Sequence, residues 1–229
     1  MLNGIRTILY LIVWPGFLEL CRDLCTRHGT VLFFDEVLTA FRVAPGGAQQ
    51  KLGVTPDLCV LGKAFGAGMP ISALVGSKAL MSHLQPLGSS QMSGTFLAHL
   101  TGVMAALAAL EEYSRPGFYE RLDDLCEEFY AGFQQAIDRS GVQLQLQFAG
   151  PRFGLYFDVA GDVREYRKAA TKNHEAERNF VRACYQRGVY FQPAAHHGFS
   201  AVHSREDLQL ALDAIAAALA DVRATQSRV

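Results

Sequence analysis

Two short apolar runs, each followed by charged residues, decide the fold of this chain. Residues 30–36 read TVLFFDE, and residues 58–63 read LCVLGK. Neither run alternates between apolar and polar residues, which is typical of strands buried on both faces, as in a parallel sheet. Asp35 follows the first predicted strand, and Lys63 follows the second. Ligands of open α/β sheets bind beyond the carboxyl ends of the strands, so we expect both side chains at a ligand-binding edge.

The residues around these strands predict an α/β domain. Its other predicted elements are a helix from Pro15 to Gly29, a strand at 71–75, a loop at 77–100 and an alanine-rich helix at 101–113. Pro116-Gly117 closes the last of these helices. We therefore place the end of this domain at residue 116.

The remaining residues, 117–229, predict a smaller α+β domain. Its predicted elements are a helix through Leu122 and Ile137, strands at 142–148, 153–159 and 189–191, a helix at 175–187 and a final helix from Ser204. Ser204 and Asp207 have the spacing of a capping box. The final helix carries an apolar stripe made of Leu208, Leu212, Ile215, Leu219 and Val222.

Composition indicates a folded protein that does not bind nucleic acid or membranes. Half of the 229 residues are hydrophobic and 19% are charged, which allows a large core. The 21 basic and 22 acidic residues give a net charge of -1, so nothing favours a polyanionic partner. The apolar run at residues 8–14 is too short to span a bilayer and precedes no signal-peptide cleavage site. We expect a buried strand or an irregular segment there.

The cysteines and histidines do not predict a metal site. The five cysteines are odd in number and dispersed, as expected for reduced core cysteines of a cytoplasmic protein; they are Cys21, Cys25, Cys59, Cys126 and Cys184. Cys21 and Cys25 are one helical turn apart but lack further ligands at a suitable spacing. His196, His197 and His203 lack a nearby carboxylate, so we interpret them as loop and packing residues.

Lys63 allows two interpretations. A lysine at a strand end can simply reach solvent. Alternatively, burial beyond an apolar strand would remove hydration from its ammonium group and lower its pKa. The neutral amine could then attack an aldehyde and form an imine. The position alone favours the first interpretation.

Asp35 is also ambiguous by itself but complements Lys63. A carboxylate at a strand end can cap a helix, bind a metal or pair with a cation. Together, however, the two residues suit a pyridine cofactor, which acts as an electron sink while its ring nitrogen stays protonated. A buried aspartate would hold that proton, and the lysine would supply the imine.

Two glycine-containing segments offer weaker alternatives. Gly66-Ala67-Gly68 could belong to a dinucleotide-binding module, but no third glycine completes the motif and Pro70 interrupts the expected helix. Residues 93–95, SGT, precede a predicted helix. They could bind a phosphate with a hydroxyl and free N–H groups, or could simply cap that helix.

The two runs and their surroundings resemble a known family. Residues 32–42, LFFDEVLTAFR, and residues 53–70, GVTPDLCVLGKAFGAGMP, resemble the signature of class III aminotransferases. The similarity extends from about Pro15 to the final helix. It implies the C-terminal part of a fold type I pyridoxal-phosphate enzyme, with a mostly parallel sheet and flanking helices.

The resemblance also implies roles for four residues. Lys63 would form the internal aldimine with pyridoxal 5'-phosphate, and Asp35 would bind the pyridine nitrogen. Val37 would pack against the ring face. Thr95, in a segment that resembles the family's threonine segment, would contact the cofactor phosphate across a homodimer interface.

The implied activity is transfer of an amino group between an amino acid or amine and a keto acid or aldehyde. Residues 41–49 and 198–208 resemble glutamate-1-semialdehyde 2,1-aminomutase-like members, which implies intramolecular amino transfer as an alternative. Residues 87–91 and 96–99 depart from the aminomutase pattern and leave aminotransfer favoured. The family's N-terminal half, with its phosphate loop, has no counterpart before Pro15. A truncated, non-catalytic chain is therefore a further alternative.

Overall fold

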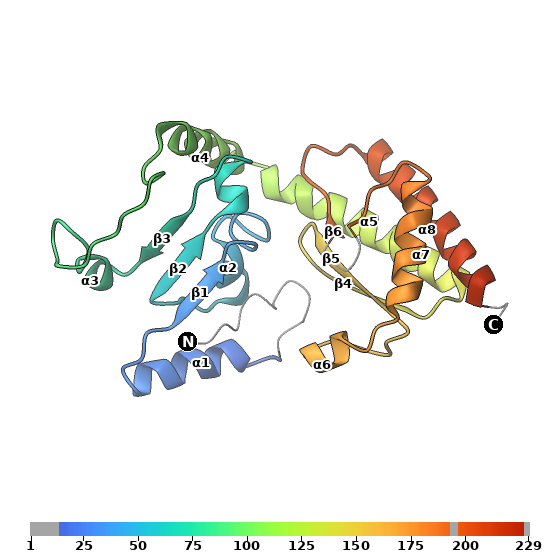
Figure 1. The fold of residues 1–229 in the computed structure, drawn as a ribbon, viewed down its shortest axis with the longest axis horizontal. Helices are drawn as coiled ribbons and strands as arrows, with labels where there is room; N and C mark the ends of the chain where they lie inside the picture. The colour runs from blue at the N-terminus through green and yellow to red at the C-terminus, as the bar shows by residue number, and fades with distance from the viewer. Residues whose placement is uncertain (1–13, 193–196, 227–229) are drawn as a thin grey trace. The chain divides into compact units, whose positions relative to one another are not determined.

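A computed structural model describes residues 14–192 and 197–226. Nearly all of the apolar run at residues 8–14 lies outside the described residues. The chain divides into two compact units, and the division falls between Tyr119 and Glu120. The first unit has strands β1 to β3 and helices α1 to α4, and the second has strands β4 to β6 and helices α6 to α8 (Figure 1). Helix α5 (Phe118–Ser140) contains the division.

The first unit contains a three-stranded mixed sheet of order β1-β2-β3. Strand β1 pairs in parallel with β2, and β3 pairs antiparallel with β2. Its elements are α1 (Phe17–Arg27), β1 (Phe33–Glu36), α2 (Gly47–Leu52), β2 (Leu58–Leu61), the 3-10 helix η1 (Lys63–Gly66), β3 (Ala73–Gly76), α3 (Lys78–Met81) and α4 (Leu100–Tyr113). The short helix α3 lies within the segment predicted as a loop.

A compact apolar core joins α1 to the first two strands. Leu18 and Cys25 of α1 pack with Leu32, Phe34, Val54 and Cys59. Asp57, just before β2, accepts hydrogen bonds from the Leu32 N–H at 2.7 Å and from the Arg22 guanidinium at 2.8 Å. These bonds link α1 to the segments that lead into β1 and β2.

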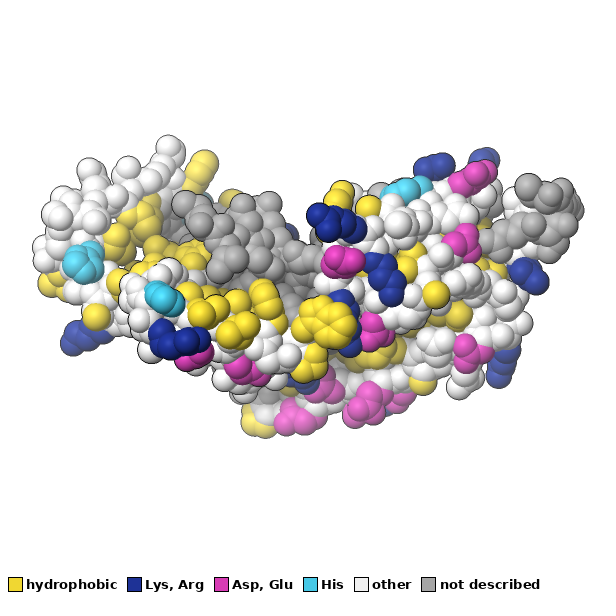
Figure 2. Space-filling model, turned by 90° about the horizontal axis from the view of Figure 1, so that it is seen from below, with side chains coloured by type: hydrophobic (Ala, Val, Ile, Leu, Met, Phe, Trp, Pro, Cys, Tyr) yellow, Lys and Arg dark blue, Asp and Glu magenta, His cyan; other side chains and the backbone are white. Residues whose placement is uncertain are grey.

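The expected burial of β1 on both faces is wrong for the described residues. Phe34 is fully buried, but Phe33 is 41% exposed because successive side chains of a strand point to opposite faces. The apolar residues Phe17, Leu20 and Leu24 of α1 are also exposed. Figure 2 shows hydrophobic side chains gathered along this helix. The first unit thus presents apolar surface on both α1 and β1.

The second unit contains an antiparallel sheet of order β4-β5-β6 and several helices. Besides α5, its elements are β4 (Leu144–Ala149), β5 (Arg152–Phe157), α6 (Tyr166–Ala169), α7 (His174–Tyr185), β6 (His197–Gly198) and α8 (Arg205–Gln226). The prediction of a strand at 189–191 is wrong. Phe191 instead packs its ring against Phe153 and Phe180, while β6 takes the place beside β5.

Aromatic rings form the core of the second unit. Phe133, Phe153, Phe157 and Phe180 are each at most 1% exposed. The ring centroids of Phe133 and Phe153 lie 5.8 Å apart, nearly perpendicular to each other. Burial of such a side chain contributes about 2 kcal/mol. This core holds α5 and α7 against β5.

The predicted start and buried stripe of α8 are confirmed. The Ser204 N–H donates to Asp207 Oδ2 at 2.8 Å, and the Asp207 N–H donates to Ser204 Oγ at 3.1 Å. These reciprocal bonds are a capping box. Leu208, Ile215, Leu219 and Val222 are buried, and Leu212 is half-buried.

The cysteines lie in the cores, and all five are free thiols. Cys21 is half-buried and the other four are buried. Burial raises the pKa of Cys59 and of Cys184 to about 12, so both thiols stay protonated near neutral pH.

Across residues 14–192 and 197–226, no helix has the length and apolar character needed to cross a membrane.

Candidate active site

The parallel pairing of β1 and β2 brings Asp35 and Lys63 to one edge of the sheet. Asp35 is opposite Val60, and Glu36 is opposite Leu61, the last residue of β2. Lys63 follows Leu61 by two residues. Both side chains therefore lie at the carboxyl ends of neighbouring parallel strands, where ligands of α/β sheets bind.

Asp35 and Val37 form one side of this edge. The half-buried Asp35 accepts a hydrogen bond at Oδ1 from the Val37 N–H at 3.1 Å. Val37 packs beside the buried Gly62: a methyl group added at Gly62 would lie 3.4 Å from Val37 Cγ1. The apolar Val37 side chain thus adjoins the residue that precedes Lys63.

Lys63 is exposed, as in the interpretation that its position alone favours, and the alternative of a lysine that has lost its hydration is wrong for the described residues. The reason is its place in the fold: Lys63 begins the turn η1 beyond β2, and only Cys59 of β2 is buried. Lys63 has a φ of 50°, in the left-handed region that non-glycine residues seldom occupy. Such backbone conformations persist where neighbouring structure enforces them, and they cluster at functional sites.

Glu36, which sequence reasoning did not select, fixes the loop after β1. It is fully buried, and its carboxylate accepts hydrogen bonds from Thr39 Oγ1 at 2.7 Å, the Ala48 N–H at 2.6 Å and the Gln49 N–H at 2.9 Å. Gly47 has a φ of 71° and lies so close that an added methyl group would collide with the carboxylate. Glu36 therefore caps the start of α2 and ties it to the end of β1.

Thr95 lies outside the β1–β2 edge. It is exposed and sits five residues before α4, whose N-cap is His99. The interpretation of residues 93–95 as a helix cap is therefore wrong. The chain around Thr95 is rich in exposed apolar side chains, namely Met92, Phe96, Leu97 and Leu100.

The dinucleotide-loop interpretation of Gly66 and Gly68 is also wrong. In a nucleotide-binding βαβ unit the glycines lead into a helix and then a parallel strand. Here η1 is a single 3-10 turn, and the next strand, β3, is antiparallel to β2. The segment after β2 therefore presents Lys63 and lacks the helix N-terminus that would hold a pyrophosphate.

Of the three histidines singled out from the sequence, His197 and His203 lie in the second unit and the third lies outside the described residues. His196 is that residue. His197 is buried, and neither ring nitrogen has a hydrogen-bond partner in the described part of the chain. His203 is exposed and contacts Ser200. The described residues contain no group of three His, Cys, Asp or Glu side chains placed to hold a metal ion.

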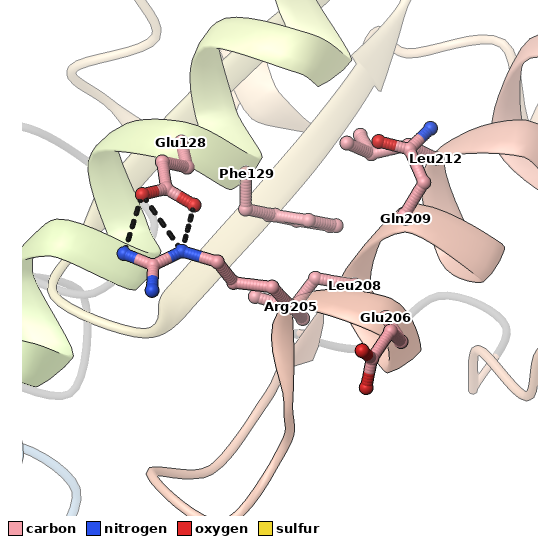
Figure 3. Close-up of a pocket in the computed structure, with 7 residues that line it drawn as sticks. All are labelled: Glu128, Phe129, Arg205, Glu206, Leu208, Gln209 and Leu212. Atoms are coloured by element: carbon pink, nitrogen blue, oxygen red, sulfur yellow. Dashed lines mark hydrogen bonds and ion pairs between the residues drawn. The ribbon is translucent and has the colours of Figure 1, made fainter.

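The second unit also has a hollow between α5 and α8 (Figure 3). Phe129, Leu208 and Leu212 provide its apolar wall. Arg205 forms a two-pronged ion pair with Glu128, with N–O distances of 2.7 and 2.8 Å. Arg205 and Glu128 neutralise each other. Glu206 also lines the hollow, but no lysine is among the residues that line it, so this lining offers no amine to hold a pyridine cofactor as an imine.

The β1–β2 edge, in contrast, has a set of groups that fits such a cofactor. An amine, a carboxylate and an apolar side chain come together there in Lys63, Asp35 and Val37. The family model described as "Aminotransferase class-III" matches residues 10–222. The chain belongs to the class III aminotransferase family. Members of this family are enzymes that use pyridoxal phosphate.

Individual relatives show the same affiliation. A glutamate-1-semialdehyde 2,1-aminomutase from Bordetella avium (strain 197N) is 43% identical over 211 residues, covering 91% of this chain and 49% of that protein. An omega-transaminase from Sphaerobacter thermophilus is 32% identical with a TM-score of 0.85, covering 92% of this chain and 48% of that chain. A transaminase solved with PLP bound is 26% identical with a TM-score of 0.80, covering 94% and 49%. The chain thus spans about half the length of these class III relatives.

Proposed function

We propose that this protein is a pyridoxal-phosphate-dependent aminotransferase in which Lys63 holds the cofactor. The observation that carries the proposal is the meeting of Lys63 and Asp35 at the carboxyl ends of two parallel strands. The left-handed backbone of Lys63 supports it, because the fold maintains an unfavourable conformation at that residue. The proposed substrates are an amino acid or amine and a keto acid or aldehyde.

Each of the residues at this edge would have a separate role in the reaction. When bound, the cofactor supplies an electron sink for the substrate carbon that loses a proton. Lys63 would bind the cofactor through Nζ and, once released, move a proton at the substrate Cα. The Asp35 carboxylate would hold the proton on the ring nitrogen, because its negative charge favours the protonated form. Val37 would pack against the ring face.

Covalent capture tests this proposal directly. We expect that treating the 229-residue chain with pyridoxal phosphate and then borohydride labels Lys63, as read by peptide mass spectrometry. Lys63→Arg should lose the label while keeping the charge. Lys78→Arg, at another exposed lysine, is the matched control and should retain it. Wild-type chain without label on Lys63 would refute the proposal and favour the non-catalytic alternative.

Thr95 and the surrounding apolar surface support a homodimer. We propose that Thr95 contacts the cofactor phosphate bound to a second copy of the chain. Exposed Phe96, Leu97 and Leu100 beside it would be covered by such an association.

We also propose that residues 1–116 belong to the cofactor-binding domain and residues 117–229 to the small domain. We further propose that the protein works in the cytoplasm, where its free cysteines stay reduced.

Intramolecular amino transfer is the second candidate function. It is favoured by the 43% identity to a protein named glutamate-1-semialdehyde 2,1-aminomutase. The two reactions are distinguished by supplying an amino aldehyde such as glutamate-1-semialdehyde as the sole substrate and analysing the product. Formation of an isomer with the amino group on a different carbon, with no other acceptor present, would indicate the aminomutase reaction. Turnover that requires a separate keto acid or aldehyde, which gains the amino group, would indicate aminotransfer.

A further inference from the structure

An aromatic cluster lies behind the turn that carries Lys63. The ring of Phe41 stacks on Phe65, with centroids 6.0 Å apart, and on Tyr113, with centroids 5.8 Å apart. Phe65 belongs to η1, Phe41 to the loop after β1, and Tyr113 to the end of α4. The cluster therefore connects the segment after Asp35, the turn of Lys63 and a helix.

Two phenol groups anchor this cluster to the backbone. Tyr113 Oη donates a hydrogen bond to the Ala64 carbonyl at 2.9 Å, and Tyr119 Oη donates to the Phe41 carbonyl at 3.1 Å. Burial raises the pKa of Tyr113 and raises that of Tyr119 to about 12. Both phenols thus remain protonated donors at physiological pH.

The two carbonyls that accept these bonds lie at, or next to, residues with a left-handed backbone. Phe41 and Lys63 both have positive φ, 59° and 50°. Ala64, which accepts the Tyr113 bond, is the residue next to Lys63, and its carbonyl also accepts the Ala67 N–H at 3.2 Å. This carbonyl belongs to the Ala64–Phe65 peptide unit, which directly follows the Lys63–Ala64 unit, so the bond restrains the turn immediately after Lys63.

We propose that Tyr113 is a positioning residue for Lys63. By donating to the Ala64 carbonyl and stacking on Phe41, it fixes the position of the Lys63 turn relative to the loop that follows Asp35. The role towards the cofactor rests on the proposed function. Tyr113 itself does not touch the reacting atoms. Its contribution is to restrict where the Lys63 amine can lie.

Tyr113→Phe tests this role because it removes the hydroxyl and keeps the ring. The matched control is Tyr130→Phe in the second unit, which removes a similar bond, from Tyr130 Oη to the Gly150 carbonyl at 2.8 Å. In the cofactor-free chain we expect amide hydrogen exchange at Phe65 and Ala67 to rise about fivefold in Tyr113→Phe, the usual effect of one such bond. Tyr130→Phe should leave these amides unchanged.

The second measurement is the capture of pyridoxal phosphate by Lys63, trapped with borohydride over a range of concentrations. Tyr113→Phe should lower the limiting rate about fivefold and leave the half-saturating concentration unchanged. A merely structural role would not change the limiting rate while leaving the half-saturating concentration as it is. If Tyr113→Phe does not fold, Phe41→Leu removes the stacking and should give the same pattern.

The outcomes separate the two proposals. Equal exchange at Phe65 and Ala67 in Tyr113→Phe and wild type would overturn the positioning role. So would faster exchange with an unchanged limiting rate of capture. Wild-type chain that never labels Lys63 would instead overturn the proposed function, and with it any role of Tyr113 towards the cofactor.

Discussion

The buried carboxylate of Glu36 shows how a single residue supports the candidate site without belonging to it. Its hydrogen bonds hold Thr39 and the start of α2 against the end of β1, immediately beside Asp35. Loss of this carboxylate would leave several buried donors without an acceptor. The loop that contains Val37 would then lose the bonds that the carboxylate makes to Thr39 and to α2.

Glu36→Ala is therefore expected to destabilise the protein by about 3 kcal/mol, since it leaves buried backbone N–H groups unsatisfied. Urea unfolding followed by circular dichroism measures this change. Glu111→Ala, at an exposed glutamate of α4, is the control and should change the free energy of unfolding by less than about 0.5 kcal/mol. Similar values for the two variants would contradict the role given to Glu36.

His197 should make stability depend on pH. Burial, with the positive charges of Lys172 and Arg152, lowers its pKa from 6.5 to about 4. Between these values the unfolded chain binds the proton and the folded chain does not. Stability is therefore fully present above about pH 6.5 and is lost as the pH falls towards 4.

The expected loss from this residue is on the order of 3 kcal/mol by pH 4. His197→Phe should remove that part of the pH dependence, as measured by the difference between wild-type and variant unfolding free energies across the range. His28→Phe, at an exposed histidine, should leave the wild-type slope in place. A His197→Phe curve parallel to that of wild type would show that His197 is not held neutral.

At the scale of elements, α8 depends on its N-terminal capping box. Ser204→Ala removes the acceptor for the Asp207 N–H and should lower the free energy of unfolding by about 1 kcal/mol. Ser204→Asp retains an acceptor at the cap and should lose much less. Thermal unfolding of the two variants measures the difference, and equal midpoints would argue against the cap.

Strands β1 and β2 show where prediction from the sequence succeeded and where it failed. The bounds of β2 were predicted correctly because Leu58–Leu61 is a continuous apolar run with a glycine and a charge after it. Strand β1 was predicted at residues 30–34 but spans Phe33–Glu36, and its end was placed two residues early because Asp35 and Glu36 look like strand-ending residues. They continue the strand because Glu36 finds its donors in α2, twelve residues away, which no local pattern shows.

At the scale of the whole molecule, the exposed apolar residues near α4 should mediate self-association. Met104, on α4, is 56% exposed and lies in the same helix as the exposed Leu100 and Leu107. Met104→Glu should therefore shift the protein towards monomer in sedimentation velocity, because burying an unpaired carboxylate is costly. Val202→Glu, at an 89% exposed residue of the second unit, is the matched control. An unchanged dimer fraction in Met104→Glu would contradict the proposed interface.

The sequence by itself determined the family, the order of the longer helices and of strands β1 to β5, and the choice of Asp35 and Lys63, because these depend on local runs and on motif spacing. Tertiary structure alone decided the environment of those residues. It exposed Lys63 at a left-handed turn, buried Glu36 as the acceptor for α2, and joined Phe41, Ala64 and Tyr113 across 72 positions of the chain. Such contacts depend on which distant side chains the packed fold brings together, and hydrophobic periodicity and motif spacing describe only the residues near each other in the chain.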